Sequence, residues 1–255
     1  MVNKCLRGYC TLMQWSEEGV VLGVRRHGET SAIADLLTRG HGRHLGLVRG
    51  GRSRKSRPVL QPGNLVIAGW RARLEDQLGT FTVEPVEMRA AKLIADAFKL
   101  AGLSTLTGWS QVLPEREPHP RLYDALTVAL AALDDDGTWP AVLVRYEMGL
   151  LEELGFGLDL SRCAATGAGE NLVYVSPRSG RAVSAMAGAP YRDRLFALPT
   201  FLRDTDAGRP GPEDVIAGLR LTGHFLQRHV LQPRDLAAPG ARALVIDRLA
   251  KSHRA

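Results

Sequence analysis

Seven permanently cationic side chains fall within the twenty residues from Arg39 to Pro58, which read RGHGRHLGLVRGGRSRKSRP. The stretch also holds two histidines and five glycines but no carboxylate, so these charges have no local counter-charge. Clustered lysine and arginine side chains release condensed counterions from nucleic acid, which makes binding favourable. The pattern therefore predicts contact with a phosphate backbone. The alternative is a solvated loop that only improves solubility.

Two groups of cations are the candidates for phosphate contact. The first group belongs to the basic stretch: Arg43, Arg49, Arg52, Arg54, Lys55 and Arg57. The second group lies on neighbouring predicted strands, where the alternation does not fix which way a side chain faces: Arg25, Arg26, Arg71 and Arg73. Aromatic rings are sparse in this region, which favours binding through the backbone over reading of the bases. Trp70 could stack on a base, but we favour a core position for it.

Catalytic chemistry finds little support in the sequence. The phosphate-cradling motif GxxxxGK[ST] is absent, and Gly167-Ala168-Gly169 lacks the preceding strand and the third glycine of a dinucleotide-binding loop. A nuclease would need several carboxylates beside the basic stretch to hold two metal ions, and only Glu29 and Asp35 are near it. We therefore expect no enzymatic activity and no cofactor.

Metal binding is also not expected. His41 and His44 are separated by a glycine and an arginine, so we interpret both as solvated residues of a rim loop. A zinc knuckle needs two C-x-x-C pairs, whereas Cys163 is followed by Thr166 at the matching position and by no later cysteine. One thiolate cannot complete a tetrahedral zinc site. We predict no metal and a small, partly buried Cys163.

Length and composition are those of a globular protein with room for two domains. The chain has 255 residues, of which 45% are hydrophobic and 24% charged, and its formal net charge of +6 favours acidic partners. Three cysteines are too few for a disulfide framework, so a cytoplasmic location is expected. No apolar run reaches the length of a membrane span. Residues 1–13 lack the features of a signal peptide, and we expect them to be a disordered extension.

Between Trp15 and Glu87 the hydrophobic residues alternate with the period of two that is typical of half-buried strands. Five strands are predicted: Gly19–Arg26, Ser31–Thr38, His44–Val48, Leu65–Leu74 and Gly79–Val86. The second run could also form a helix, but its length and flanking turns favour a strand. Five short strands with a long basic loop predict a closed barrel of OB type; an open sheet and an SH3-like barrel are alternatives.

From Met88 onward the period changes to that of amphipathic helices. Helices are predicted over Met88–Leu103, Leu122–Leu133, Trp139–Leu154, Pro212–Leu231 and Gly240–Leu249. The charged residues between Arg145 and Glu153 are placed on the outer face of their helix. A glycine-rich, irregular stretch before the fourth helix holds two short strand-like pieces: Leu172–Val175 and Arg181–Val183.

Three pieces of sequence occur in a fixed order: GVVLGVRRHGETSAIADLLT, then the basic GGRSRKSR followed by LQPG, then RYEMGLLEELGFGLDLSRC. Together they resemble the RecO family of bacterial DNA repair proteins, and the resemblance covers nearly everything from Gln14 onward. It implies an α+β fold with an N-terminal five-stranded OB-type barrel over residues 14–87. A helical domain over residues 88–255 follows, with a small zinc-knuckle-like insertion at about 156–190 that lacks the metal ligands.

The resemblance also implies a function. Members of the family are recombination mediators that bind single- and double-stranded DNA, anneal complementary strands, and bind the acidic C-terminal tail of single-stranded-DNA-binding protein. With RecR they help load RecA onto coated single strands. In some members the insertion carries four cysteines that bind zinc. Because only Cys163 stands at such a position, we expect packing and turns at Gly167 and Gly180 to hold the segment.

An alternative function is a protein adaptor that binds acidic peptide tails and has little affinity for DNA. The cations of the helical domain that could bind such a tail are not ranked by their spacing: Lys99, Arg121, Arg145, Arg220 and Arg228.

Overall fold

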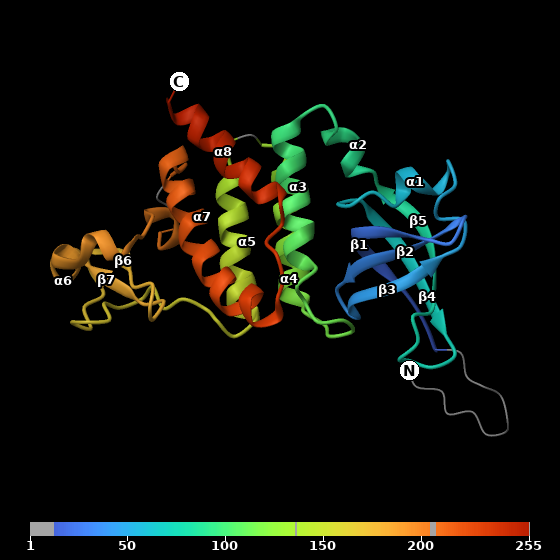
Figure 1. Ribbon diagram of the computed structural model, residues 1–255, viewed down its shortest axis with the longest axis horizontal. Helices are drawn as coiled ribbons and strands as arrows, with labels where there is room; N and C mark the ends of the chain where they lie inside the picture. Colours follow the sequence, from blue (N-terminus) through green and yellow to red (C-terminus); the bar gives the residue numbers. More distant parts are fainter. Residues whose placement is uncertain (1–12, 136, 205–207, 255) are drawn as a thin grey trace. The chain divides into compact units, whose positions relative to one another are not determined.

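The computed structural model describes residues 13–135, 137–204 and 208–254, without the side chains of residues 253 and 254 (Figure 1). It contains two compact units. One consists of the described residues as far as Ala95 together with Leu113–Tyr123, and the other of Asp96–Val112 and the residues from Asp124 onward. The first unit thus extends past the boundary predicted at residues 87 and 88. The predicted extension lies outside the described residues except for Met13, which begins the first strand.

Five strands form the barrel of the first unit: β1 (Met13–His27), β2 (Ser31–Thr38), β3 (Gly42–Val48), β4 (Leu65–Ala72) and β5 (Thr80–Glu87). They close into a barrel in the order β1-β2-β3-β5-β4. Neighbouring strands are antiparallel except β3 and β5, which pair in parallel at Leu47 and Thr80. The predicted OB-type barrel is confirmed, and the ambiguous second run is a strand.

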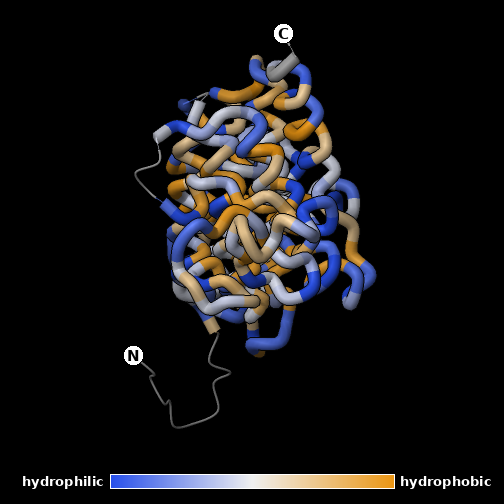
Figure 2. The backbone as a smooth tube through the Cα atoms, turned by 90° about the vertical axis from the view of Figure 1, so that its left-hand side faces the viewer, coloured by the Kyte–Doolittle hydropathy of each residue, from blue (hydrophilic) through white to orange (hydrophobic). Residues whose placement is uncertain are grey.

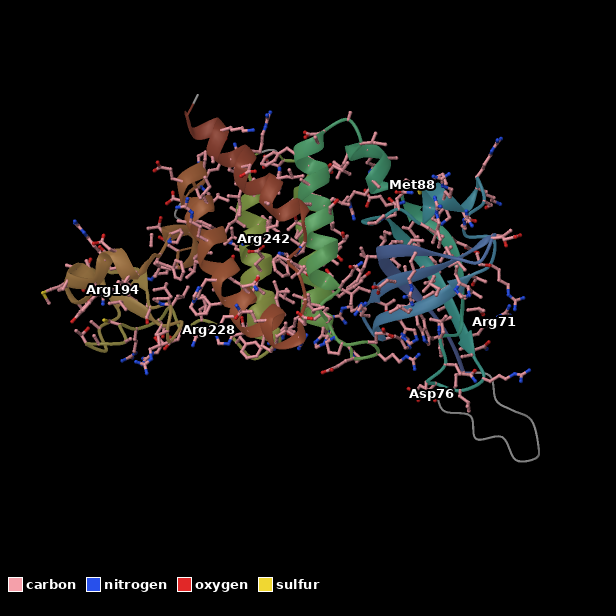
Figure 3. All side chains as sticks on the ribbon, viewed as in Figure 1. Arg71, Asp76, Met88, Arg194, Arg228 and Arg242 are labelled. Carbon is pink, nitrogen blue, oxygen red and sulfur yellow. The ribbon has the colours of Figure 1, made fainter. Side chains whose placement is uncertain are left out.

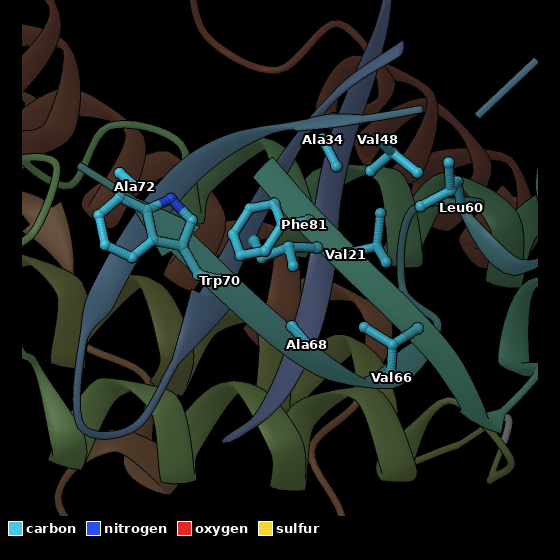
Figure 4. Close-up of a cluster of buried hydrophobic side chains, with 10 residues drawn as sticks. Val21, Ala34, Val48, Leu60, Val66, Ala68, Trp70, Ala72 and Phe81 are labelled. Atoms are coloured by element: carbon cyan, nitrogen blue, oxygen red, sulfur yellow. The ribbon is translucent and has the colours of Figure 1, made fainter. Parts of the chain in front are cut away.

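The barrel is filled from alternate positions of its strands, as the period of two requires. On β3 the buried positions run from Gly42 to Val48 in steps of two. Gly46 leaves room for the Phe81 ring, which would lie 2.4 Å from a Cβ atom at that position. Burial of each large apolar side chain contributes roughly 1.5–3 kcal/mol. Figure 4 shows the resulting core: Val21, Ala34, Leu36, Val48, Leu60, Val66, Ala68, Trp70, Ala72 and Phe81.

The segment Leu113–Tyr123 belongs to the barrel unit because its backbone and one side chain bond to it. The N–H of Arg116 donates to the carbonyl of Arg43 at 2.7 Å, and Glu115 forms an isolated parallel β-bridge with Arg43. The guanidinium of Arg116 also donates to the carbonyl of Gln77 at 2.8 Å. Three prolines in this stretch prevent a regular helix, so the chain follows the barrel instead.

The second unit is built mainly from helices: α3 (Ala97–Ser110), α4 (Pro120–Ala132), which starts in the first unit, α5 (Trp139–Glu153), α7 (Pro212–Leu226) and α8 (Ala241–Arg254). Helices α3, α5, α7 and α8 pack on one another. Helix α7 continues into the π-helix η3 (Gln227–Leu231) and the 3₁₀ turn η4 (Gln232–Arg234). The sequence predicts one regular helix over Pro212–Leu231, which is α7 and η3 together.

The single helix predicted over Met88–Leu103 is divided into α2 (Arg89–Leu93), in the first unit, and α3. Asp96 separates them: its backbone is extended, and its side chain accepts the N–H groups of Phe98 and Lys99 at 2.9 and 3.1 Å. This is the N-cap arrangement that starts a helix. The hydrophobic stripe of the sequence continues across Asp96, so periodicity alone did not predict this break between two helices. An N-cap depends on local hydrogen bonds, which have no period in the sequence.

The insertion predicted at about 156–190 holds two strands of a small three-stranded sheet in the order β7-β6-β8, and the third strand lies beyond it. The elements of this region are β6 (Leu172–Val175), β7 (Ala182–Ser184), α6 (Ala185–Gly188), η1 (Ala189–Arg194), β8 (Phe196–Ala197) and η2 (Thr200–Leu202). Gly167 and Gly180 have φ values of +73° and +68°, the left-handed conformation that their turns require. The N–H of Cys163 donates to the carbonyl of Ala168 at 2.7 Å, which closes the first turn.

Cys163 is 1% exposed, so its burial is complete and not partial as predicted. Its Sγ accepts the N–H of Ser184 at 3.3 Å. Hydrogen bonds with Ser184 and then Thr166 lower the pKa of the thiol to about 6. No group of three His, Cys, Asp or Glu side chains that could hold a metal ion occurs among the described residues. A single thiolate cannot complete a tetrahedral zinc site.

Apolar stretches of the backbone are short and separated by hydrophilic ones (Figure 2). The long helices α5 and α7 each have 15 residues, whereas a membrane span needs about 20. Over the described part of the chain, no helix has the length and apolar character to cross a membrane.

Candidate nucleic-acid interface

The basic segment after β3 is an ordered turn and a one-turn helix, not the irregular flexible loop that the sequence predicts. Gly50 has a φ of +65°, and its carbonyl accepts the N–H of Ser53 at 2.9 Å. The side chain of Ser53 accepts the N–H of Ser56 at 3.1 Å, where α1 (Ser56–Val59) begins. Serine side chains bond readily to nearby backbone, so this highly charged segment holds one conformation.

Arg52 ties this segment to the turn between β1 and β2. Its backbone N–H donates to the carbonyl of Thr30 at 3.0 Å, and its Nη1 donates to the carbonyls of Gly28 and Glu29 at 2.9 and 2.6 Å. Its Nε and Nη2 make no hydrogen bond with the residues that the structure describes. A guanidinium held in this way loses little further side-chain entropy when it binds an anion.

A hollow of about 280 Å³ lies between the basic segment and β1. Arg26 of β1 reaches it together with Arg52 and Arg57 of the segment. The other residues that line it are apolar or uncharged: Val24, Ala32, Gly51, Leu60, Gln61 and Pro62. Its described lining contains no carboxylate, so three like charges share a small volume without a counter-ion. An anion relieves their repulsion, and phosphate suits the planar donors of a guanidinium.

The remaining predicted cations of the segment are exposed around this hollow. Arg49, Arg54 and Lys55 make no hydrogen bond or ion pair with the described residues. Arg25 is exposed as well, but the strand alternation places it on the face of β1 opposite Arg26, where its charge acts on Asp35. We call Arg26 together with the exposed cations of the segment the basic surface: Arg26, Arg49, Arg52, Arg54, Lys55 and Arg57.

Arg71 and Arg73 are not among the residues that line this hollow. Arg71 is exposed on β4, projects from the barrel (Figure 3), and lines a separate, shallower groove of about 450 Å³ that also includes Trp15. Arg73 is exposed just past the end of β4, because that strand stops at Ala72 and not at Leu74 as predicted.

Arg43 is not part of the basic surface, contrary to the prediction. Its Nε and Nη2 donate to the carboxylate of Asp35 at 2.9–3.1 Å, and its Nη1 donates to the carbonyl of Leu113 at 3.0 Å. The Arg43 side chain is only 19% exposed. Burial raises the pKa of Asp35, while the hydrogen bonds and charge of Arg43 oppose that rise. Arg43 therefore neutralises a buried acid, and no free charge remains for phosphate.

His44 is not the solvated residue that the sequence predicts. β3 begins at Gly42, so His44 lies inside the strand and not at its rim, and it shares the inward face with Gly46 and Val48, where it is 4% exposed. Its ring centroid lies 4.7 Å from that of Trp70, and neither ring nitrogen has a hydrogen-bond partner among the described residues. Burial, and then the charge of Arg116, lower the pKa of His44 to about 4.

The ring of Trp15 already packs against other aromatic rings of the barrel. The His41 ring stacks on it at a centroid distance of 4.3 Å, and Trp70 lies nearly parallel at 6.0 Å. His41 is half-exposed and is held by Glu17, with 2.9 Å between its Nδ1 and the carboxylate. Trp70 is 2% exposed and donates to the carbonyl of Leu78, so the core position that we favour for it is confirmed.

A closed barrel of this strand order, followed by a helical unit, defines an α+β protein of the OB-fold class. A family model for the N terminal of recombination protein O matches residues 13–89, and one for the C terminal of recombination protein O matches residues 109–236. The chain belongs to the RecO family of DNA repair proteins.

Similar proteins support this membership over nearly the whole chain. The DNA repair protein RecO of Methylobacterium nodulans is 57% identical over 238 residues, which are 92% of this chain and 97% of that protein. The protein of the same name from Mesorhizobium japonicum is 54% identical over 241 residues, 94% of this chain and 95% of its own. That of Rhodopseudomonas palustris is 52% identical over 244 residues, with coverages of 94% and 97%. The role of the family is in DNA repair.

Proposed function

We propose that this protein is a recombination mediator that binds single- and double-stranded DNA and anneals complementary strands. Acting with RecR in the cytoplasm, it helps load RecA onto single strands coated by single-stranded-DNA-binding protein. The observation that carries the proposal is the hollow lined by Arg26, Arg52 and Arg57, whose described lining holds no carboxylate. Family membership supports the repair role, and the hollow supports phosphate as the ligand.

Binding in this proposal uses the phosphate backbone. One phosphate enters the hollow, where Arg52 is already held by the Gly28 and Glu29 carbonyls and donates its remaining N–H groups. Arg26 and Arg57 supply the adjacent charge, and the exposed cations of the basic surface neutralise neighbouring phosphates. Phosphate contacts carry no base sequence, so binding is independent of sequence.

Annealing follows from charge neutralisation. Two complementary strands repel each other through their phosphates, and a cationic surface that neutralises both lets them approach and pair. This step needs neither nucleotide hydrolysis nor a catalytic group. In this proposal the protein is a mediator and not an enzyme.

The test is binding of the full-length protein to a fluorescent single strand across a salt series. The test variant changes Arg52, Arg54, Lys55 and Arg57 to alanine. If these residues neutralise about four phosphates, the slope of log K against log salt flattens by roughly three on a single strand. Loss of annealing of complementary strands by the same variant would extend the result to that activity.

A matched control removes four exposed arginines of the second unit and so makes the same change in net charge: Arg192, Arg194, Arg220 and Arg248 to alanine. We expect this control to keep a slope close to that of the unaltered protein. An unchanged slope in the test variant, with affinity intact, would exclude the basic surface as the DNA site. If the salt slope flattened equally in both variants, DNA binding would depend on the net charge of the protein and not on the basic surface.

The adaptor function has its own supporting observation, a hollow of about 350 Å³ in the helical unit. Arg145 and Arg209 line it together with Ala141, Val142 and Phe201, and Asp135 lines it as well and pairs with Arg209 at 3.0 Å. Cations beside apolar groups suit an acidic peptide that ends in hydrophobic residues, such as the tail of single-stranded-DNA-binding protein, whose carboxylates would replace Asp135 at Arg209. Of the five cations predicted for this role, Arg145 alone lines this hollow; Lys99, Arg121, Arg220 and Arg228 do not.

The two functions are separated by a variant in which Arg145 and Arg209 are changed to alanine. We expect it to lose affinity for a synthetic acidic tail peptide and to keep the salt slope on DNA. If the unaltered protein binds the peptide but no DNA at any salt concentration, the adaptor function replaces the mediator function.

A further inference from the structure

Phe156 is fixed at the end of α5 by a Schellman motif. The sequence LEELGFG places Gly155 just past the helix, where it adopts a φ of +84°. The N–H of Gly155 donates to the carbonyl of Glu152 at 3.0 Å, and the N–H of Phe156 donates to that of Leu151 at 2.7 Å. These are the two reversed hydrogen bonds of the motif, and glycine takes the left-handed position without strain. The backbone of Phe156 is therefore set by the helix itself.

The Phe156 ring is the outer member of a column of three stacked rings. The Phe156 and His229 rings lie 5.0 Å apart at 12°, and the His229 and Phe225 rings lie 6.1 Å apart at 7°. Exposure rises along the column: Phe225 is 2% exposed, His229 is intermediate, and Phe156 is 37% exposed. Phe156 makes no other ring contact with the described residues. The column thus leads from the core of the helical unit to an aromatic group that is open to solvent.

A cation stands beside this column on an unusual piece of backbone. His229 and Arg228 belong to the π-helix η3, a rare form that is often found at functional sites. Arg228 is exposed, and its Nη1 donates to the carbonyl of Pro177 at 3.1 Å, which the His224 ring also contacts at 3.1 Å. The Nε and Nη2 of Arg228 make no hydrogen bond with the described residues. Figure 3 labels Arg228, below α7 and toward the small sheet.

We propose that Phe156 and Arg228 form a single-strand contact site in the helical unit, separate from the basic surface of the barrel. A base of single-stranded DNA stacks on the solvent-facing side of Phe156 as the fourth ring of the column, and its phosphate binds Arg228. This site rests on the proposed function and adds to it a base contact in the helical unit, whereas Trp15 of the barrel already stacks on His41.

The Phe156 ring is preorganised for stacking. Stacking on an aromatic side chain strengthens single-strand binding roughly 5- to 100-fold per base, and it tolerates any base because each has a π face. Phe156 is held by its helix cap and by His229, so little side-chain freedom is lost on binding. Bases that are paired in a duplex offer no free face, so this site selects single strands over double strands.

The experiment compares two ligands that carry the same number of phosphates: an oligothymidylate and an abasic phosphodiester strand. The variant is Phe156→Leu, which keeps an apolar side chain in the column and removes the aromatic face. We expect its affinity for oligothymidylate to fall roughly 5- to 100-fold, with the affinity for the abasic strand and the salt slope unchanged. Circular dichroism and thermal unfolding show whether the variant is folded.

Tyr191→Leu is the matched control, because Tyr191 is 60% exposed in the same unit and makes no ring contact with the described residues. We expect it to bind both strands like the unaltered protein. Equal loss in Tyr191→Leu and Phe156→Leu would mean that exposed aromatics act without a specific site. Unchanged oligothymidylate binding by folded Phe156→Leu would overturn this site while leaving the proposed function intact. Failure of the unaltered protein to bind either strand would instead overturn the proposed function.

Cross-linking locates the contact independently of variants. A single strand that contains 5-iodouracil is irradiated with the unaltered protein, and the modified peptide is found by mass spectrometry. We expect a cross-link in the peptide that contains Phe156. Cross-links confined to peptides of the barrel would overturn the site. Loss of acidic-peptide binding by Phe156→Leu, with DNA binding intact, would assign this surface to a protein partner and overturn it as well.

Discussion

The carboxylate of Glu147 and the guanidinium of Arg242 form a two-point ion pair in the core of the helical unit. The Nε–Oε1 distance is 2.7 Å and the Nη2–Oε2 distance is 2.9 Å, and Glu147 is 0% exposed. Glu147 also accepts from the Trp109 Nε1 at 2.7 Å and from the Thr222 hydroxyl. One carboxylate on α5 thus bonds to side chains on α3, α7 and α8.

Arg242→Met should strongly destabilise the helical unit. It leaves the Glu147 carboxylate buried without its counter-charge, and loss of one partner from a buried pair costs about 3–5 kcal/mol. Urea unfolding followed by circular dichroism measures the loss. The control is Glu152→Gln on the exposed face of α5, which should change stability by less than about 0.5 kcal/mol. A loss in Arg242→Met no larger than that of the control would show that the ion pair contributes little.

The buried position of Glu147 could not be predicted from the sequence. Hydrophobic periodicity predicted α5 to within one residue of its ends, but it assigned every charge of that helix to the outer face. A charged residue on a buried stripe is recognisable only through its partner, and Arg242 lies 95 residues away. The same limit hid the N-cap of Asp96, because hydrogen-bond partners leave no periodic signal in a sequence.

The barrel was more predictable than the site on it. Alternation gave five strands and their order of appearance, because a half-buried strand must alternate. His44 was interpreted as a rim residue, but β3 begins two residues before it, at Gly42, so His44 lies inside the strand on the same buried face as Gly46 and Val48. Composition identified the basic segment, but only the fold could show that Arg26 joins Arg52 and that Arg43 does not.

The stability of the barrel should fall as the pH falls from 6.5 to 4. His44 has its ordinary pKa of 6.5 in the unfolded chain and about 4 in the folded barrel. Between these values the unfolded state binds a proton that the folded state does not, so acid favours unfolding. At about 1.4 kcal/mol per unit of pKa difference, the loss approaches ~3 kcal/mol. Urea titrations at several pH values within this interval measure it.

His44→Leu provides the comparison. It removes the titrating group and two ring nitrogens that lack hydrogen-bond partners among the described residues, so stability at neutral pH should be kept or raised. Its unfolding free energy should depend less on pH between 6.5 and 4 than that of the unaltered protein. Parallel pH profiles for the two proteins would assign the acid sensitivity to other groups.

Arg43→Gln should destabilise the barrel and leave DNA binding unchanged. The variant leaves Asp35, which is 9% exposed, without its ionic partner, and we expect a loss of about 3 kcal/mol. Because Arg43 carries no free charge to the surface, the salt slope on single strands should match that of the unaltered protein. Fluorescence titration at a temperature where the variant is fully folded measures this slope. A slope flattened by about one would instead return Arg43 to the DNA site.

The rate at which Cys163 reacts with a thiol reagent should be slow and nearly independent of pH between 7 and 9. Hydrogen bonds with Ser184 and Thr166 hold its pKa at about 6, against 9.0 for a free thiol, so the folded protein already carries the thiolate in this range. The free energy of unfolding therefore rises as the pH rises from 6 to 9, because Cys163 keeps its proton in the unfolded chain and has lost it in the folded protein. Access limits the reaction, since the residue is 1% exposed.

The measurement uses a Cys5→Ser, Cys10→Ser background, and the same protein in urea serves as the control. In urea the rate should rise about tenfold per pH unit below the free pKa, and the same rise in the folded protein would mean that the thiol titrates normally.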